Sequence, residues 1–300
     1  MKKLAILFLL LGTFPAHACD VCGCANSGAY FGLLPQSHRS MLGVRYQQLR
    51  FVTHPASEVL RTEETFQITE LYGRFFPVKR VQVLAFLPFR SDRQQTTYDE
   101  KRQNALGDAT VLANYNVLNT FMDRDEATRF NHSLLLGGGV KLPTGRFRYD
   151  EKDPLAVANA NFQPGTGSTD FILNAFYNLN YAGWGLAVNL SRKFNTTNDR
   201  GYRFGNQWYG TADFFRSFEL GKLSLVPSVG LYGEYGAHGQ QDGTLLTETG
   251  GTLLNGTAGL TLFANRWTLG LNAQRPLAQN LSDGHVVAKS RGLVQLAWLF

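Results

Sequence analysis

The feature that most constrains this chain is a two-residue alternation of apolar and polar side chains, repeated along most of its length. Over residues 170–181, for example, every second side chain is apolar or aromatic (Phe171, Leu173, Ala175, Tyr177, Leu179 and Tyr181), and the interleaved positions include Asp170, Asn174, Asn178 and Asn180. A period of two residues indicates β-strands. We find no long segment with helical spacing. Candidate strands begin near residues 41, 64, 80, 108, 132, 168, 184, 204, 222, 252, 266 and 290.

Most of these candidate strands run for roughly 10 to 15 residues. Strands of soluble proteins are usually about 5–6 residues long, whereas a tilted strand needs about 9–11 residues to cross a bilayer. The lengths therefore favour strands that cross a membrane.

The connections between the strands alternate in length, and this is independent evidence for a membrane barrel. Tight turns are expected at 77–80, 181–183, 219–221 and 265–266, and long polar loops at 53–63, 92–106, 144–167, 196–203, 237–251 and 277–289. Only the segment 120–131 departs from the alternation. Short turns at one end and long loops at the other are typical of outer-membrane barrels.

The sequence therefore predicts an all-β, transmembrane up-and-down antiparallel β-barrel of about 12 strands, in the range 10–14. Lipid cannot satisfy backbone N–H and C=O groups, so the last strand must pair with the first and close the sheet. We expect the barrel to lie in the bacterial outer membrane, in contact with its lipid, and both termini to be periplasmic.

The composition of the chain argues against a soluble protein, a nucleic-acid-binding protein and a protein with a transmembrane helix. Charged residues make up 17% of the chain, below the roughly 25% typical of soluble proteins. The formal net charge is only +6, without a basic cluster, so a nucleic acid is not expected as a partner. After residue 18, no apolar run approaches the 18 residues that argue for a transmembrane helix.

The N-terminal residues divide into two predicted segments before the barrel. Residues 1–18 combine Lys2 and Lys3 with an apolar run and Ala16-His17-Ala18, the pattern of a secretory signal peptide. Residues 19–40 form a periplasmic segment that could plug the barrel mouth or lie along its rim. The barrel itself is predicted over residues 41–300.

The C-terminal residues carry a further pattern. Leu296, Trp298 and Phe300 occupy alternate positions and end on an aromatic side chain. This resembles the C-terminal signal by which barrel-assembly machinery recognises outer-membrane barrels. We therefore expect these three residues to act as an insertion signal.

The alternation also predicts which side chains face the lumen. Apolar sets should face lipid, and the alternate sets, rich in Asn, Thr, Ser and Gln, should face inward. The predicted pore-lining residues are Arg45, Asn114, Asn116, Asp170, Asn174, Asn178, Asn189, Lys193, Glu234, Asn272 and Gln274. A twelve-stranded lumen lies between a packed interior and an open channel, so the sequence leaves both open.

The three cysteines of the chain lie within six residues, Cys19, Cys22 and Cys24. Thiolates bind Cu(I) or Zn well, and the amine of Cys19 or His38 could supply another ligand, which gives one hypothesis. A disulfide formed in the oxidising periplasm is the second. A lipid anchor on Cys19 is the third, although Ala16 and His17 match a lipoprotein cleavage box poorly.

Short motifs resemble a known family. Gly107-Asp108-Ala109 opens a strand, residues 141–145 (KLPTG) close one, and residues 163–170 (QPGTGSTD) lead into the next. Together they resemble bacterial outer-membrane barrels of the meta-pathway phenol-degradation transporter type. The resemblance covers roughly residues 100–300 and implies a transport role. The Cys19–Cys24 head lies outside that pattern and resembles the Cys-Asp-x-Cys-Gly-Cys start of other bacterial barrels.

The functional expectation is passive or gated passage of a small solute, either a metal ion or a small hydrophobic or aromatic compound. The alternative is a non-conducting outer-membrane scaffold or a barrel that captures metal. We expect no enzymatic activity, because the chain contains neither H-E-x-x-H nor G-x-S-x-G.

Overall fold

The structure is a computed structural model that describes residues 39–123, 130–148 and 162–300. Its elements are β1 (Met41–Thr53), β2 (Thr62–Val78), β3 (Val81–Thr96), β4 (Glu100–Leu106), β5 (Thr110–Asn119), α1 (Thr120–Asp123), β6 (Phe130–Lys141), β7 (Asp170–Tyr181), β8 (Trp184–Phe194), β9 (Tyr202–Arg203), β10 (Gln207–Arg216), β11 (Phe218–Leu220), β12 (Leu223–Gly236), β13 (Gly239–Gln241), β14 (Thr244–Leu246), β15 (Gly251–Ala264), β16 (Trp267–Leu281), η3 (Ser282–Gly284), β17 (Val286–Ala288) and β18 (Arg291–Leu299). No helix among these residues has the length and apolar character needed to cross a bilayer.

The strands close into a barrel whose wall, within the described residues, has twelve antiparallel strands. Each wall strand pairs with the next along the chain, and β18 pairs with β1 from Met41↔Leu299 to Gln48↔Gly292. Two wall strands are interrupted, one between β4 and β5 and one between β17 and β18. The predicted barrel and its strand count are confirmed.

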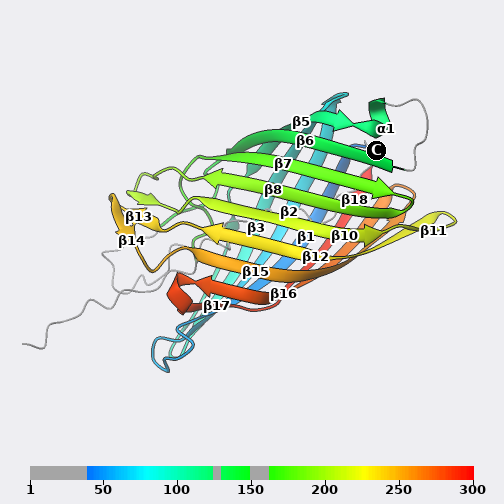
Figure 1. The fold of residues 1–300 in the computed structure, drawn as a ribbon. Helices are drawn as coiled ribbons and strands as arrows, with labels where there is room; N and C mark the ends of the chain where they lie inside the picture. The colour runs from blue at the N-terminus through cyan, green and yellow to red at the C-terminus, as the bar shows by residue number, and fades with distance from the viewer. Residues whose placement is uncertain (1–38, 124–129, 149–161) are drawn as a thin grey trace, which may run out of the picture.

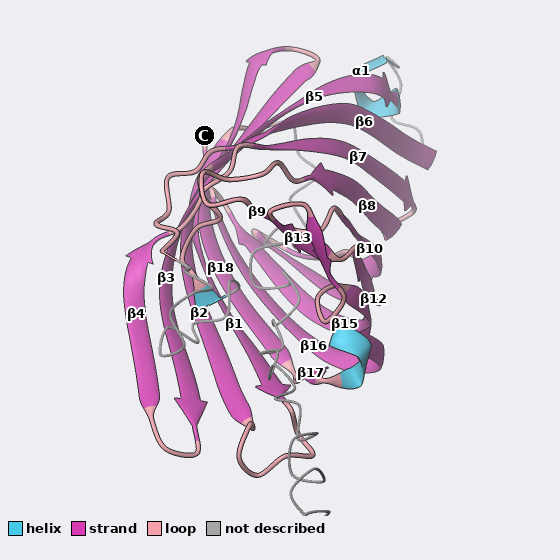
Figure 2. Ribbon diagram, turned by 90° about the vertical axis from the view of Figure 1, so that its left-hand side faces the viewer, coloured by secondary structure: helices cyan, strands magenta, loops and turns pink. Residues whose placement is uncertain are grey.

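The two ends of the barrel differ as the loop lengths predicted. In Figure 1 the C-terminus lies at the end that carries α1 and β11, whereas β13 and β14 lie at the opposite end. We call these the short-turn end and the long-loop end. Figure 2 looks into the long-loop end, where β9, β13 and the connecting loops cross the opening.

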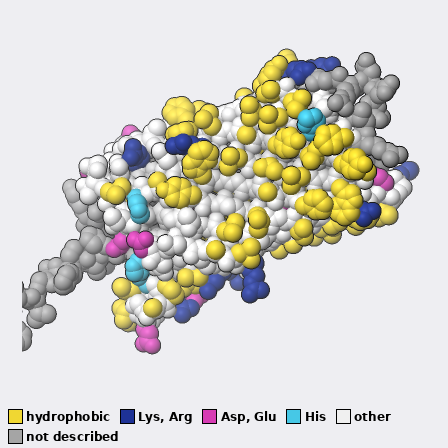
Figure 3. All heavy atoms as spheres, in the orientation of Figure 1, with side chains coloured by type: hydrophobic (Ala, Val, Ile, Leu, Met, Phe, Trp, Pro, Cys, Tyr) yellow, Lys and Arg dark blue, Asp and Glu magenta, His cyan; other side chains and the backbone are white. Residues whose placement is uncertain are grey.

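The outer surface of the wall is apolar. Side chains of the outward set are exposed, among them Leu42, Val44, Leu173, Leu231 and Leu271. Hydrophobic side chains gather over the wall strands in Figure 3, and charged side chains lie mostly near the ends. Because hydrocarbon tails can cover this surface, no second protein layer is needed.

Two of the predicted loops are instead largely strand. Over 92–106, β3 continues to Thr96 and pairs with β4, so this segment is a hairpin that extends the wall. Over 277–289, β16 continues to Leu281, and β17 occupies residues 286–288. The hairpin over 92–106 was missed because its strands are mostly polar on both faces. The strand residues in 277–289 were missed because Leu281, Val286 and Ala288 are apolar but face inward, so the apolar side chains do not form a lipid-facing alternation.

Candidate functional site in the barrel lumen

The structure places all eleven predicted lumen residues on the inner set of each strand. Nine of them are buried, and Asn178 and Asn272 are half-buried. Their neighbours along the strand, such as Phe171 and Leu173 beside Asp170, are exposed on the outer surface. The eleven residues therefore share the inner face of the wall, and their role in lining a conducting path stays a prediction.

Several of these side chains form buried polar contacts across the inner wall. The Nδ2 of Asn174 donates to Asn189 Oδ1 at 3.0 Å and to Ser191 Oγ at 2.6 Å. Arg45 pairs with Glu70, and its guanidinium lies 5.8 Å from the ring centroid of Tyr72. These contacts satisfy part of the hydrogen-bonding capacity of polar groups that the closed wall holds away from bulk solvent, whereas Asn174 Oδ1 has no partner within the described residues.

A cluster of three charged side chains lies at the long-loop end of β5, β6 and β7. Lys141 Nζ is 2.8 Å from Asp108 Oδ2 and 2.8 Å from Asp170 Oδ2, and all three side chains are at most 6% exposed. Only Asp170 of the three was predicted as a lumen residue. We call these residues the Asp108–Lys141–Asp170 cluster.

Asp108 also binds both arms of the connection between β6 and β7. Its Oδ1 accepts a hydrogen bond from the backbone N–H of Gly145 at 2.9 Å. Its Oδ2 accepts from the backbone N–H of Thr166 at 2.8 Å and from the Thr166 hydroxyl at 2.7 Å. We call residues 142–148 and 162–169 the loop arms. One carboxylate thus ties both arms to the wall.

The family motifs are the residues that build this junction. Thr144 Oγ1 donates to Gly107 O and accepts from the Ala109 N–H, both at 2.8 Å. The arms touch at Gly145 and Gly165, where a Cβ on Gly165 would lie 2.5 Å from the Gly145 carbonyl carbon. No larger side chain fits at that contact without moving backbone. Motifs distant in sequence therefore form one anchoring site.

The second loop arm lies inside the long-loop mouth. Its residues 162–166 are all buried. Arg90, on the inner face of β3, donates to Gln163 O at 2.8 Å and pairs with Asp92 at 2.7 Å. The Phe162 ring lies 6.3 Å from that of Phe66, on the inner face of β2. The arm therefore reaches from β6 and β7 to the wall formed by β2 and β3.

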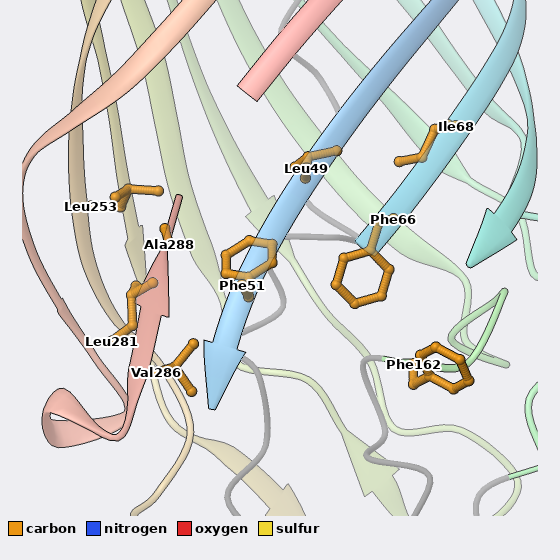
Figure 4. Close-up of a cluster of buried hydrophobic side chains, with 9 residues drawn as sticks. All are labelled: Leu49, Phe51, Phe66, Ile68, Phe162, Leu253, Leu281, Val286 and Ala288. Carbon is orange, nitrogen blue, oxygen red and sulfur yellow. The ribbon is translucent and has the colours of Figure 1, made fainter. Parts of the chain in front are cut away.

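Apolar side chains form a second inner feature, which we call the inner apolar cluster. It consists of Leu49, Phe51, Phe66, Ile68, Phe162, Leu253, Leu281, Val286 and Ala288. Figure 4 shows these side chains on the inner wall of β1, β2 and β15 to β17, with Phe162 contributed by the loop arm. The sequence predicted a largely polar lumen and did not indicate this cluster.

A pair of histidines joins two loops at the same end. The ring centroids of His54 and His285 lie 5.3 Å apart. The backbone N–H of His54 donates to the backbone carbonyl oxygen of His285 at 2.7 Å. Burial lowers the pKa of His54, the charge of a protonated His285 lowers it further, and Glu248 opposes these effects. The packing of the two histidines therefore favours the neutral form of the His54 ring.

The remaining predicted residues fall into two groups. Cys19, Cys22, Cys24 and His38 lie outside the described residues, and within the described ranges no cluster of His, Cys, Asp and Glu could hold a metal ion. Leu296, Trp298 and Phe300 all point outward and are 39–51% exposed. The rings of Trp298 and Phe300 are stacked with centroids 4.9 Å apart.

Sequence reasoning missed the anchoring role of Asp108 and Lys141. The motifs that contain them were interpreted as strand ends and loop turns. A lone Asp and a lone Lys at strand ends, 33 residues apart, do not show that they meet. The sequence contained one signal for this site, because a charged residue stands at the long-loop end of each of three consecutive strands.

The fold and the inner face define the class: the chain is an outer-membrane β-barrel. Over 90% of its length it resembles the crystal structure of an outer membrane channel from Pseudomonas putida F1, covering 100% of that chain, with a TM-score of 0.63 at 15% identity. The beta domain of the Bordetella autotransporter BrkA is more distant, with a TM-score of 0.48 at 10% identity, over 87% of this chain and 100% of the other. No curated protein matches the sequence.

The particular family follows from the sequence. Residues 61–283 match the family described as "Putative MetA-pathway of phenol degradation". The chain belongs to this family, which confirms the resemblance that its strand-end motifs indicated.

Proposed function

We propose that the barrel carries a small, uncharged solute across the outer membrane, along a path that the loop arms constrict. The observation that carries this proposal is the second arm, residues 162–169, which lies inside the mouth and contacts the facing wall through Arg90 and Phe66. A segment held there by a few polar contacts narrows the lumen and can move without unfolding the wall. Selection then depends on lumen polarity and constriction.

The charge balance of the inner face supports an uncharged solute. Among the buried residues of the described chain, five are basic and six are acidic. Ion-selective pores carry rings of a single charge sign, whereas here the two signs are close to balanced and several are paired. Such a face offers hydrogen bonds without strong preference for an anion or a cation.

The relatives support the same class of function. The structure with the same fold is named an outer membrane channel, and the family description refers to phenol degradation. The inner apolar cluster provides a surface suited to a small hydrophobic or aromatic compound.

Liposome swelling tests the proposal. Liposomes that contain the purified full chain should swell in isotonic solutions of small uncharged solutes, and swelling should slow as solute size rises. Rates for a cation and an anion of similar size should be close to each other. Swelling no faster than in protein-free liposomes would contradict the proposal.

The close packing of the inner side chains favours a second candidate, a non-conducting scaffold. Arg45, Asn114, Asp170 and Lys193 are each at most 3% exposed, as in a filled interior. The same swelling assay separates the candidates, because a scaffold would leave liposomes impermeable even to the smallest solute.

We also propose a metal-binding role for the cysteine head, with Cys19, Cys22, Cys24 and His38 as ligands for Cu(I) or Zn. This proposal rests on residue type and spacing. Titration of the reduced full chain with Cu(I) or Zn, beside a variant with all three cysteines changed to Ser, tests it. Equal binding by both proteins would contradict a thiolate site.

A further inference from the structure

The outer face of β1 to β4, which lie side by side in Figure 2, carries basic side chains in register near the long-loop end. Arg50 of β1 pairs with Thr65 of β2, Thr65 pairs with Arg93 of β3, and Arg93 pairs with Arg102 of β4. On the other side of β1, Lys289 follows β17, and its N–H donates to Arg50 O at 2.9 Å. Residues that are directly opposite on antiparallel strands share a face. We call Lys289, Arg50, Arg93 and Arg102, all of them exposed, the basic row.

The basic row lies at the edge of the apolar outer surface. On β3, the exposed Phe89 is followed on the outer face by Ser91 and then by Arg93, and on β1 the exposed Tyr46 precedes Arg50 in the same way. Four residues of strand cover about 13 Å, and an arginine stem can reach back along apolar surface while its charged head stays in water. The guanidinium groups therefore lie where lipid headgroups begin. If the termini are periplasmic, as the sequence predicts, these are headgroups of the outer leaflet.

The positive charge of the basic row is only partly neutralised by the protein. Glu100 pairs with Arg93 at 3.0 Å and also with Arg102. Within the part of the chain that the structure describes, no acidic side chain pairs with Arg50 or Lys289. Like charges directly opposite each other destabilise a pair of strands, and the row contains Arg93 beside Arg102 and Arg50 beside Lys289. An anion bound to the row would relieve both repulsions.

The wall on the other side of the barrel has a different outer face at its long-loop end. There the exposed side chains include Phe171 of β7, Trp208 of β10 and Tyr235 of β12. Arg192 of β8 lies among aromatic rings, 4.7 Å from the ring centroid of Phe194 and 4.9 Å from that of Trp208. Aromatic side chains of this kind are typical of the membrane–water interface. The basic row is thus a feature of one side of the barrel.

From this arrangement we propose that the basic row binds a glycolipid of the outer leaflet whose disaccharide headgroup carries phosphate groups. Neighbouring strands lie about 4.8 Å apart, so the row spans about 19 Å from Lys289 to Arg102, enough for a disaccharide with a phosphate at each end. Guanidinium groups bind phosphate oxygens through two parallel N–H donors. The apolar wall beside the row receives the acyl chains. This binding site is independent of passage through the lumen and fits either candidate function.

The first test removes charge from the row. Native mass spectrometry of the purified full chain in detergent, titrated with bis-phosphorylated lipid A, measures the affinity. The combined variant Arg50→Gln, Arg93→Gln and Lys289→Gln should bind about tenfold more weakly, the effect expected when three exposed ion pairs are lost together. Glu100→Gln should bind severalfold more tightly, because it removes the carboxylate that competes with phosphate for Arg93 and Arg102.

The matched control removes the same charge from the opposite end of the barrel. Lys79, Lys222 and Arg266 are exposed in short turns, and their combined change to Gln should leave the affinity for lipid A unchanged. Folding of each variant is checked by the heat-dependent gel mobility of an intact barrel. Equal affinities of the basic-row variant and the short-turn variant would overturn the proposal.

A second comparison changes the lipid. Lipid A without its phosphate groups should bind the unmodified chain at least about tenfold more weakly, because the ion pairs are lost. Phosphatidylglycerol, with one phosphate and no disaccharide, should also bind more weakly than lipid A. Undiminished binding of dephosphorylated lipid A would contradict phosphate recognition, and equal binding of phosphatidylglycerol would contradict the assignment to an outer-leaflet glycolipid.

Discussion

The anchoring of the loop arms by Asp108 gives the sharpest prediction. Asp108→Ala removes the acceptor for the N–H groups of Gly145 and Thr166, for the Thr166 hydroxyl and for Lys141. Because one side chain serves both arms, its loss should release them together. The expected result is a large increase in the time that the lumen spends unconstricted.

The magnitude follows from the burial of the cluster. Removing one partner of a buried ion pair typically costs about 3–5 kcal/mol, because the remaining charge is left without its counter-charge. Here Lys141 keeps Asp170, so the lower end, about 3 kcal/mol, is the appropriate figure. Each 1.4 kcal/mol is a factor of ten, so the ratio of docked to released arms should fall about a hundredfold.

Two measurements on the purified full chain check this prediction. Limited proteolysis should cut the β6–β7 connection much faster in Asp108→Ala, and single-channel recordings should show a higher open probability. The control is Asp99→Ala at the exposed tip of the β3–β4 hairpin, where the carboxylate accepts from the N–H of Glu100. If both variants behaved like the unmodified chain, the anchoring argument would be refuted.

Three further predictions follow from other parts of the barrel. Deleting Phe300 should lower the fraction of chain inserted in the outer membrane, measured by heat-modifiable mobility, and an unchanged fraction would argue against an insertion signal. Because the pKa of His54 is lowered in the folded chain, the His54–His285 contact should weaken as pH falls below about 6.5. The protection factors of the amides in loop 54–61, which correct each exchange rate for the pH dependence of intrinsic exchange, should be lower at pH 5 than at pH 7.5, and His285→Gln should reduce this difference. Gly139→Ala would place a Cβ 1.9 Å from a backbone oxygen of the neighbouring strand, so the free energy of unfolding in detergent should fall by roughly 1–3 kcal/mol, whereas Gly292→Ala, in open space, should change it little.

The wall of the barrel could be predicted from the sequence because residues that face lipid must be apolar, whereas their neighbours along the strand face the lumen and can be polar. Leu271 faces hydrocarbon and Asn272 faces inward, so the period of two residues appears directly in the composition of the strand. The rule fails where strands extend beyond the bilayer. At Arg93 and Arg102, a cross-strand pair of the β3–β4 hairpin, the outward side chains are charged. The inward neighbours Asp92 and Gln94 are polar too, so the sequence resembles a loop.

The anchoring site could be predicted only in part, because its geometry depends on contacts between separate loops. Asp170 was identified as a lumen residue from its alternation, but its ion pair with Lys141 requires that β6 and β7 end at the same level. The inner apolar cluster was missed for a different reason. Phe51 and Phe66 occupy inward positions, and an apolar side chain on a barrel strand is ordinarily assigned to lipid.

Single-channel conductance in a planar bilayer tests the central claim most directly. The purified full chain should give discrete current steps, and a chain without residues 19–40 should give steps of at least the same size, since a plug formed by that segment would be gone. The absence of steps from both proteins would contradict passage through the lumen.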